Sequence, residues 1–417
     1  MPEGEGNYAH RVSRALHITF VSMHTSPATM PGIGDAGGMN VVERAQAEAL
    51  AALGHRVQLV TRRSHPDDPG QVELYPGVVL RHLDAGPATP LAKSLIDDHI
   101  EQFSAGLACL SPSDVIHSHH WMSGVAALPV AVQWGVPHVQ SYHSVAAPVG
   151  SPLSAGEPPE SPRRVPGEAA VARDSQSVVA ISAAEAQTVI DRCGADADRV
   201  SIVSPGVNQE LFRPLAPGEE RWSWPTTNPG DWPHGYVLVA ARLEPLKGPD
   251  LAIQALAQVD PEIRPHLVVA GGASDAFRGY EQSLHTMVTE LGLASEVTFL
   301  SAQPRPDLAR LLRGARVVLV PSHSETFGLV ALEAAASGTP VIAAAAGGLR
   351  EAVAHGVTGQ LMDSRRPEDW ALALTRLLMV PGLLERMGRV SRVHARRFDW
   401  GFAAHRLTAI YEGLLDA

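Results

Sequence analysis

The strongest constraint on the fold is a rhythm of short β-branched runs that alternate with helical patterns along the whole chain. Such alternation is typical of parallel β-sheets covered by helices on both faces. The first half contains these runs at residues 16–22, 56–61, 78–83, 114–119, 138–143, 177–182 and 199–204. The second half restarts the rhythm at residues 236–243, 266–272, 296–300, 316–322 and 340–345.

The two series are separated by residues 212–235, whose Pro, Gly and Trp content is that of a linker with a few aromatic anchors. We therefore predict an α/β protein with two Rossmann-like, doubly wound domains that face each other across a cleft. Ligands of such sheets bind beyond the carboxyl ends of the strands. The expected parts are a disordered leader at 1–14, a first domain at 15–212, a second domain at 213–399, a helix at 400–417 that crosses back to the first domain, and a mobile loop at 147–168 over the site.

Composition excludes several classes of partner. The chain has 417 residues and a formal net charge of −11, which argues against a duplex nucleic-acid binder. Residues 1–14 are too polar for a signal peptide, and no apolar run approaches the ~20 residues of a membrane span. Cys109 and Cys193 form no disulfide or zinc motif, so a reducing, cytoplasmic setting fits best. A homodimer is compatible with the sequence, which does not fix the oligomeric state.

A glycine-rich stretch after the first predicted strand poses a choice between two functions. Gly32, Gly34 and Gly37 have the spacing G-x-G-x-x-G of a dinucleotide-binding loop, and Arg62 and Arg63 follow a strand as in NADP-dependent enzymes. In that fingerprint, however, the glycines follow the strand directly, whereas residues 25–32 intervene here. The spacing therefore favours another kind of ligand loop over a nicotinamide site.

The most informative motif lies in the second half, after the strand at 316–322. Glu325 falls in the turn, a helix is expected from Phe327 to Ser337, and Glu333 follows Glu325 by eight positions. Backbone N–H groups at the start of a helix hold phosphate, and here they would belong to Gly328, Leu329 and Val330. Arg242 and Lys247 follow the first strand of the same half and could neutralise a diphosphate.

These features together resemble a known family. E-x7-E with R-x4-K, and G-D-A-G-G-M-N at residues 34–40, are similar to the retaining glycosyltransferases of the two-Rossmann-domain (GT-B) type, sequence family 4. Within it, the chain is most similar to the mycothiol-pathway enzymes that transfer N-acetylglucosamine from UDP to inositol phosphate. The resemblance extends over nearly the whole chain and implies an acceptor-binding first domain and a nucleotide-sugar-binding second domain. It also implies front-face transfer without a metal or other cofactor.

The resemblance further implies roles for individual residues. Gly38, Arg242 and Lys247 would bind the donor diphosphate, and Gln303 lies in a segment that would meet the base through backbone atoms. Glu325 would bind hydroxyls of the donor sugar, and Glu333 those of the ribose. His143 would contact the transferred sugar. With Arg242, Lys247 and Glu325, it forms the expected catalytic group.

The expected acceptor site departs from the family pattern. Its residues are His24, Asn40, Lys93, His120, Ser144 and Arg164. The family has Tyr where this chain has His120 and Thr where it has Ser144, and the loop that follows has Pro and Gly in place of a Lys-Asn-rich segment. These departures favour a small polar acceptor other than inositol phosphate.

Three further motifs admit structural explanations. The run H-S-H-H-W at 117–121 suggests a metal cluster, but alternate residues of a strand face opposite sides, which favours core or substrate contacts. Asp196 and Asp198 form the D-x-D that binds a metal–nucleotide in other glycosyltransferases, although a turn explains them here. Arg163 and Arg164 could each be a solvated charge or an acceptor ligand.

Three functions stay open after the sequence alone. The first is transfer of N-acetylglucosamine from UDP to inositol phosphate. The second is a natural-product or mycothiol-like enzyme with another acceptor, such as an aminocyclitol or, by S-glycosylation in antibiotic biosynthesis, a small thiol like ergothioneine. The third is a non-catalytic nucleotide-sugar-binding protein, against which the four motif residues Arg242, Lys247, Glu325 and Glu333 weigh.

Overall fold

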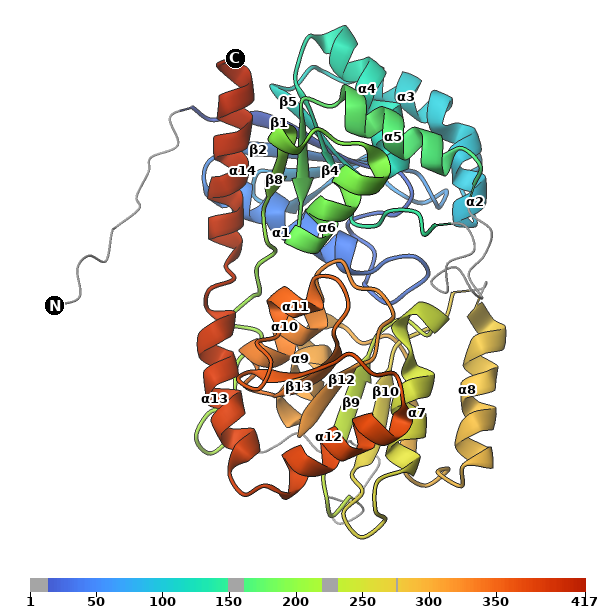
Figure 1. Cartoon of the computed structure of the whole chain (residues 1–417). Coiled ribbons are helices and arrows are strands. Elements are labelled where there is room, and N and C mark those ends of the chain that lie inside the picture. The colour runs from blue at the N-terminus through green and yellow to red at the C-terminus, as the bar shows by residue number, and fades with distance from the viewer. Residues whose placement is uncertain (1–13, 149–160, 220–231, 275–276) are drawn as a thin grey trace, which may run out of the picture.

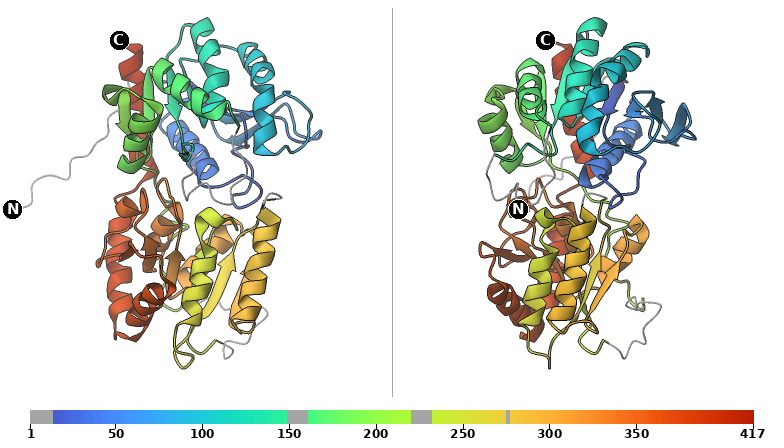
Figure 2. Two further views of the ribbon diagram at one scale, coloured as in Figure 1. Left: turned by 45° about the vertical axis from the view of Figure 1, so that its right-hand side comes forward. Right: turned by 90° about the vertical axis from the view of Figure 1, so that its right-hand side faces the viewer.

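The computed structural model describes residues 14–148, 161–219, 232–274 and 277–417, which form two layered units, one above the other (Figures 1 and 2). The predicted leader up to residue 13, residues 149–160 of the predicted loop and residues 220–231 of the linker lie outside the described part of the chain. In the described residues, no helix is both long and apolar enough to span a membrane.

The first unit is built on an eight-stranded sheet in the order β3-β4-β2-β1-β5-β6-β7-β8. Its strands are β1 (His17–Ser22), β2 (Arg56–Arg62), β3 (Gln71–Tyr75), β4 (Val78–Leu83), β5 (Val115–His119), β6 (His138–Ser141), β7 (Ser177–Ala180) and β8 (Val200–Ile202). All neighbours pair in parallel except β3, which runs antiparallel to β4 at the sheet edge. The antiparallel strand was absent from the sequence prediction because its residues are mostly exposed and show no apolar run.

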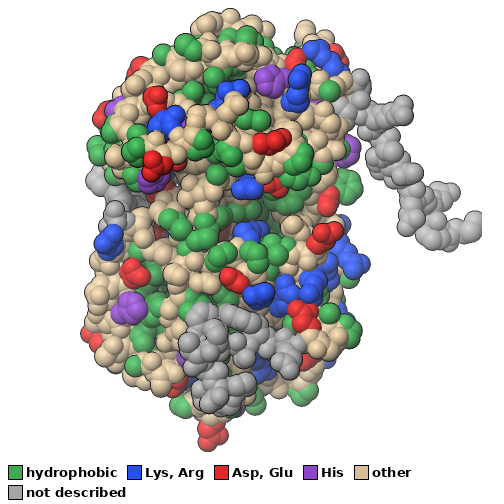
Figure 3. All heavy atoms as spheres, turned by 180° about the vertical axis from the view of Figure 1, so that it is seen from behind, with side chains coloured by type: hydrophobic (Ala, Val, Ile, Leu, Met, Phe, Trp, Pro, Cys, Tyr) green, Lys and Arg blue, Asp and Glu red, His purple; other side chains and the backbone are tan. Residues whose placement is uncertain are grey.

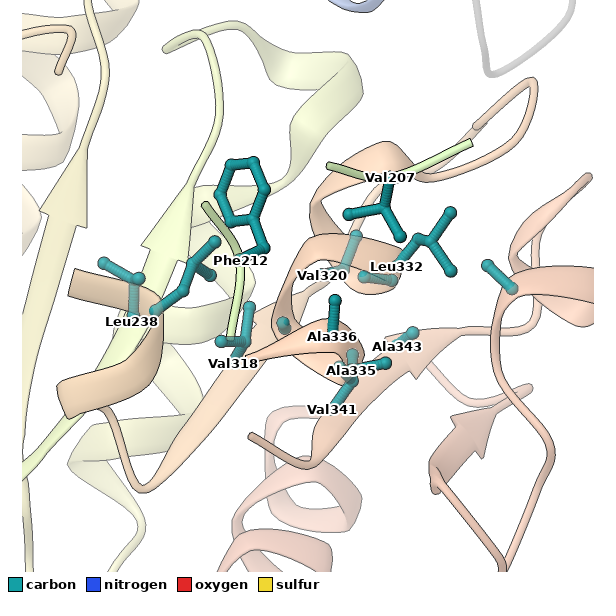
Figure 4. Close-up of a cluster of buried hydrophobic side chains, with 14 of the residues drawn as sticks. Val207, Phe212, Leu238, Val318, Val320, Leu332, Ala335, Ala336, Val341 and Ala343 are labelled. Atoms are coloured by element: carbon teal, nitrogen blue, oxygen red, sulfur yellow. The ribbon is translucent and has the colours of Figure 1, made fainter. Parts of the chain in front are cut away.

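The second unit has a six-stranded parallel sheet in the order β11-β10-β9-β12-β13-β14. Its strands are β9 (Tyr236–Ala240), β10 (His266–Ala270), β11 (Val297–Leu300), β12 (Val317–Val320), β13 (Val341–Ala344) and β14 (Gly359–Met362). Val and Ala dominate its core, where Val207 and Phe212, the first residue of the linker, pack with residues of the strands and helices (Figure 4). The predicted fold class, two doubly wound parallel sheets, is confirmed.

Helices cover the faces of both sheets. In the first unit they are α1 (Gly38–Ala52), α2 (Lys93–Ile96), α3 (Ile100–Ala108), α4 (Trp121–Trp134), α5 (Arg164–Asp174) and α6 (Ala183–Thr188). In the second unit they are α7 (Pro249–Ala257), α8 (Arg278–Glu290), α9 (Arg305–Gly314), α10 (Leu329–Ala336), α11 (Leu349–Ala352), α12 (Pro367–Met379) and α13 (Leu383–Ala395). The last helix, α14 (Trp400–Leu415), lies along the first unit (Figure 1).

Helix α14 is part of the core of the first unit. Its residues Ala404, Leu407 and Tyr411 have no exposed surface and pack with strand residues of the first sheet and with α1. Since Tyr411 also reaches the side chain of His117 on β5, at 2.7 Å, the end of the chain joins the polar interior of the sheet.

Two predicted boundaries were wrong, one of a helix and one of a loop. The helix expected from Phe327 begins only at Leu329, because Gly328 takes a left-handed conformation with φ of 96° and forms the N-cap. The loop expected at 147–168 ends early, since α5 begins at Arg164. Both differences arise at helix starts, where local turn geometry decides the boundary.

Strand order explains where a site can form. In the first sheet, β1 lies between β2 and β5, and in the second, β9 lies between β10 and β12, so the chain reverses its direction of winding at these central strands. Crevices open at such switch points, beyond the carboxyl ends of the strands. The segments that follow β1, β5, β9 and β12 therefore surround the expected cleft.

Candidate functional site

The glycine loop after β1 touches the second unit directly. A Cβ atom on Gly37 would lie 3.6 Å from Nε of Arg242, and one on Gly38 would lie 3.5 Å from Cδ1 of Leu329. A Cβ on Gly32 would lie 3.0 Å from Cβ of Ala302, tighter than an ordinary contact. Glycines thus allow this loop to approach the second unit closely, and Gly38 meets residues expected at the donor site.

The two predicted cations of the second unit are already paired with carboxylates. Lys247 Nζ lies 2.7 Å from Oε1 of Glu325, which also accepts a hydrogen bond of 3.2 Å from the hydroxyl of Ser322. Arg242 lies 3.1 Å from Glu244. The paired side chains of Lys247 and Glu325 are 19% and 18% exposed, so they remain accessible to a ligand. In the view from behind, Lys and Arg side chains lie near the level at which the units meet (Figure 3).

The start of α10 has the features expected of a phosphate site. Gly328 caps the helix, and its positive φ directs the backbone into the first turn. A φ of 96° is strained for residues with a side chain, and a Cβ there would also meet the side chain of Leu349, so the position favours glycine. The first N–H groups of a helix have no partner within it, and those of α10 follow Glu325 by only a few residues.

Glu333 is buried in α10. Its Oε1 lies 2.6 Å from Arg305, whereas Oε2 has no hydrogen-bond partner among the residues that the structure describes. Burial raises the pKa of Glu333, and the neighbouring Arg305 partly offsets this. Arg305, which opens α9, also lies over the ring of Phe212 at 4.6 Å. Gln303 lies two residues before it and donates to the carbonyl of Ser301 at 2.8 Å.

Histidines gather on the first-unit side of the site. The rings of His24 and His120 lie 4.1 Å apart, and neither ring nitrogen of His120 has a partner in the described residues. Burial lowers the pKa of both rings well below the usual value, and the charges of Lys93 and Arg164 lower it further. These two histidines are therefore neutral groups placed near two cations.

The charge of Arg164 is compensated within the protein. Its Nε lies 2.8 Å from Glu168, both side chains are 4% exposed, and its Nη2 donates to the hydroxyl of Ser144 at 3.2 Å. Arg163 points elsewhere and pairs with Glu101 at 2.6 Å. The structure therefore brings Arg164, and not Arg163, together with Ser144.

Asn40 contributes to the site differently from the expectation. Its side chain accepts from the N–H of Gly37 at 2.9 Å and donates to Thr25 and to the carbonyl of Ser26, at 3.0 and 2.8 Å. These bonds fix the glycine loop. In this structure, the polar atoms of Asn40 therefore order the loop that approaches the second unit.

His143 connects the two units through its backbone. It has a positive φ of 57°, which is uncommon for a non-glycine residue, and its carbonyl accepts from the hydroxyl of Thr326 at 2.7 Å. The carbonyl of Thr326 in turn accepts from the hydroxyl of Ser182 at 2.7 Å. Because Thr326 follows Glu325 directly, these bonds hold the backbone of His143 against the turn that carries Glu325.

A buried acid near His143 predicts a pH dependence of stability. Burial raises the pKa of Glu185 from 4.5 to about 7, and the N–H groups of Ile181 and His143 partly offset this. The folded-state pKa of Glu185 lies above the unfolded value. The stability that the protonated carboxyl contributes is therefore fully present below pH 4.5 and is lost as the pH rises through about 7. We expect E185Q to remove this loss, which is on the order of 1–3 kcal/mol.

The measurement is thermal unfolding of both proteins at pH 5 and pH 8. The wild-type protein should lose more stability than E185Q between the two pH values. A matched control is E290Q, at an exposed position of α8, which should change with pH as the wild type does. An identical pH response of wild type and E185Q would contradict the assignment.

Two sequence motifs have structural roles here. His117 and His119 of the H-S-H-H-W run stack at 4.5 Å inside the first sheet. Asp196 accepts from the N–H of Asp198 at 3.1 Å, as in a turn. Across the residues that the structure describes, no group of three or more His, Cys, Asp or Glu could hold a metal ion.

Three residues that bond to the predicted site residues were not predicted from the sequence. Glu244 pairs with Arg242, Arg305 pairs with Glu333, and the hydroxyl of Thr326 donates to the carbonyl of His143. Glu244 and Arg305 lie close in sequence to predicted residues, so inspecting the neighbours of each motif could have suggested them. The bond of Thr326 depends on how the two units meet, for which the sequence carries no signal.

Both units of the chain match known protein families. The family described as Glycosyl transferases group 1 matches residues 228–394, and the Glycosyl transferase 4-like domain matches residues 37–206. The D-inositol 3-phosphate glycosyltransferase of Thermomonospora curvata is 41% identical over 415 residues, which cover 96% of each chain. Sucrose-phosphate synthase from Thermosynechococcus elongatus is 29% identical with a TM-score of 0.87, covering 97% of this chain and all (100%) of that one. Anabaena HepE with UDP and glucose, 20% identical with a TM-score of 0.72 over 95% of this chain and 100% of that one, shares the fold.

Proposed function

The chain belongs to the GT-B glycosyltransferases, in the family of the D-inositol 3-phosphate glycosyltransferases, and from this premise we propose a retaining enzyme that transfers a sugar from a nucleoside diphosphate to a small polar acceptor. The observation that carries the proposal is the approach of the glycine loop to Arg242 and to Leu329 at the start of α10, the helix that follows the paired Glu325 and Lys247. Cations, free N–H groups and a carboxylate are the groups that a sugar diphosphate requires.

The leaving diphosphate is stabilised by fixed positive charge in this mechanism. As the bond between the anomeric carbon and the phosphate oxygen breaks, negative charge grows on the diphosphate between Gly38 and the Arg242 and Lys247 side chains. The acceptor attacks from the same face and gives its proton to the departing phosphate. Since two cations neutralise the diphosphate, we propose that no metal is needed, and activity in the presence of a chelator tests this.

Glu325 and Glu333 address different parts of the donor. Glu325 accepts from hydroxyls of the sugar after Lys247 turns to the diphosphate. Glu333 accepts from ribose hydroxyls through its unpartnered Oε2. Gln303 lies in the segment that meets the base. These roles place the anomeric carbon near His143, whose backbone is bonded to the residue after Glu325.

The acceptor site suits a small polar molecule with at most modest negative charge. The buried pair with Glu168 compensates the charge of Arg164, which makes the site less suited to a doubly charged phosphate. His24 and His120 are neutral and offer a donor or an acceptor at each nitrogen. We therefore propose an acceptor of a natural-product or mycothiol-like thiol pathway, such as an aminocyclitol or a small thiol like ergothioneine, in the reducing cytoplasm, where the free Cys109 and Cys193 are stable.

Two other functions are outcomes of the same experiment. In it, the wild-type protein is screened for binding of UDP-, GDP- and ADP-sugars, and then for donor turnover with a panel of acceptors. Turnover with a polar acceptor supports the proposal. Exclusive transfer of N-acetylglucosamine from UDP to inositol phosphate supports the activity named for the relatives. Binding without turnover of any donor would indicate a non-catalytic nucleotide-sugar-binding protein.

If His120 and Ser144 select the acceptor, changing them should improve the use of inositol phosphate. We expect inositol phosphate to be a poor acceptor for the wild type, because His120 and Ser144 replace a phenol and a larger hydroxyl side chain. The double variant H120Y/S144T should raise kcat/KM for inositol phosphate by about fivefold, since the tyrosine hydroxyl adds one hydrogen bond, which contributes about 1 kcal/mol. Competition assays at equal acceptor concentrations measure the effect. Efficient, exclusive use of inositol phosphate by the wild type would show that these residues do not select the acceptor.

A further inference from the structure

A buried acid beside the site has no role in the mechanism above. Glu43 lies on α1, five residues after Gly38, and its side chain has no exposed surface. Among the described residues, neither carboxylate oxygen has a hydrogen bond of good geometry, and Oε1 lies 3.8 Å from Nδ1 of His119. Burial raises the pKa of this carboxyl well above its usual value, and the nearby side chain of Ser22 offsets this only in part. A buried, unsatisfied acid is costly, which suggests that it has a function.

His119 connects Glu43 to the sugar side of the site. Its Nδ1 lies 2.8 Å from Nε2 of His143, a hydrogen-bond distance. The ring centroids are 5.1 Å apart with an angle of 18° between the planes, so the two rings meet edge to edge in nearly one plane. One proton is shared along this line, and its position decides which nitrogen of His143 carries a hydrogen.

Two observations place that proton on Nδ1 of His119. Either position of the proton leaves one N–H without an acceptor among the described residues, on Nε2 of His119 or on Nδ1 of His143, and His119 is the more deeply buried of the two, at 0% against 9% exposed. Oε1 of Glu43 lies 3.8 Å from Nδ1, and a carboxyl oxygen, which is partly negative even in the neutral acid, favours a hydrogen over a lone pair on that nitrogen. His119 then donates to Nε2 of His143, and His143 must carry its own proton on Nδ1.

The stacked neighbour of His119 does not compete for this proton. The hydroxyl of Ser141 donates to the carbonyl of Val179 at 2.9 Å and therefore accepts from Nε2 of His117. Nδ1 of His117 then accepts from the hydroxyl of Tyr411 at 2.7 Å. The protonated nitrogen of His117 is thus fixed by its own hydrogen-bond partners. The ring of Phe20, which also contacts His119, has no hydrogen-bonding group.

Nδ1 of His143 is also buried without a partner among the described residues. In the state deduced above, it is an N–H that requires an acceptor oxygen. We propose that Glu43 is a positioning residue, which through His119 fixes His143 as a hydrogen-bond donor to a hydroxyl of the transferred sugar. The proposal rests on the proposed function only for the identity of that oxygen.

The test reads the protonated nitrogen of His143 directly. Two-bond ¹H–¹⁵N spectra of the ligand-free protein labelled with ¹⁵N-histidine are recorded, with His143 assigned from H143Q. We expect Nδ1 to be protonated in the wild type. The amide oxygen of E43Q should preserve this state, whereas E43L should give a mixture of the two forms. The control Q46L removes another buried polar group from the same helix and should leave the spectrum unchanged.

Turnover supplies a second, independent reading. E43L should lower kcat about five- to tenfold, as expected for one hydrogen bond, with an unchanged Kd for the nucleoside diphosphate, and E43Q should restore most of it. A wild-type spectrum with the proton on Nε2 of His143, or an E43L spectrum identical to it, would overturn the proposal. If no nucleotide sugar is turned over, the proposed function fails, while the spectra still decide the role of Glu43.

Discussion

K247A is expected to lose turnover by a factor of about 10²–10³ while the fold stays intact, because one stabiliser of a developing charge is removed. The structure adds a second cause. Lys247 pairs with Glu325 at 2.7 Å, so its removal leaves a carboxylate without its cation beside the leaving diphosphate. Repulsion between these negative charges adds to the loss. Steady-state kinetics with a saturating acceptor measures kcat, and circular dichroism checks the fold.

The matched control is R350A in the same unit. Arg350 pairs with Asp363 at 2.9 Å on the surface, where the side chains are 58% and 84% exposed. Exposed pairs of this kind contribute little, so turnover should stay within a factor of about two. If K247A itself stays within about threefold of the wild type, Lys247 does not stabilise the leaving group, and the donor site must lie elsewhere.

E325Q is expected to separate turnover from nucleotide binding. The loss of charge weakens hydrogen bonds to the sugar, which for charged groups contribute about 1.5–3 kcal/mol, so turnover should fall about 10- to 100-fold. The free nucleoside diphosphate should bind at least as well as in the wild type. The reason is that the carboxylate competes with the diphosphate for Lys247 in the ligand-free protein.

Calorimetric titration of the nucleoside diphosphate and steady-state kinetics give the two quantities. E333Q is the comparison, because Glu333 is assigned to the ribose and its change should weaken binding of the diphosphate itself. Equal losses of binding and turnover in E325Q would reverse the roles of the two glutamates.

The sequence predicted the fold well where burial is continuous. Strands such as β1 and β10 are buried along nearly their whole length, and their β-branched runs are unmistakable. The antiparallel β3 is largely exposed and was missed, since its stability comes from pairing with β4 and not from a core of its own. Helix α10 was placed correctly except for its start, which the left-handed Gly328 sets.

The sequence predicted those site residues that lie at strand ends, and did not predict contacts that depend on how distant segments pack. Motif spacing identified Arg242, Lys247 and Glu325, whose positions follow from neighbouring strand ends. It did not distinguish Arg163 from Arg164, because their directions depend on the start of α5. The connection of Glu43 to His119 joins α1 to the end of β5, far apart in sequence, and only the folded chain brings them together.

The central claim is that this chain transfers a sugar with retention by stabilising a diphosphate leaving group between its two units. The most direct measurement follows the reaction by ¹H NMR, with an α-linked nucleotide sugar and the acceptor that gives turnover, in the presence of a chelator. The account predicts release of the nucleoside diphosphate and a product with an α-anomeric linkage formed at the same rate. A β-linked product, or release that stops when the metal is removed, would contradict it.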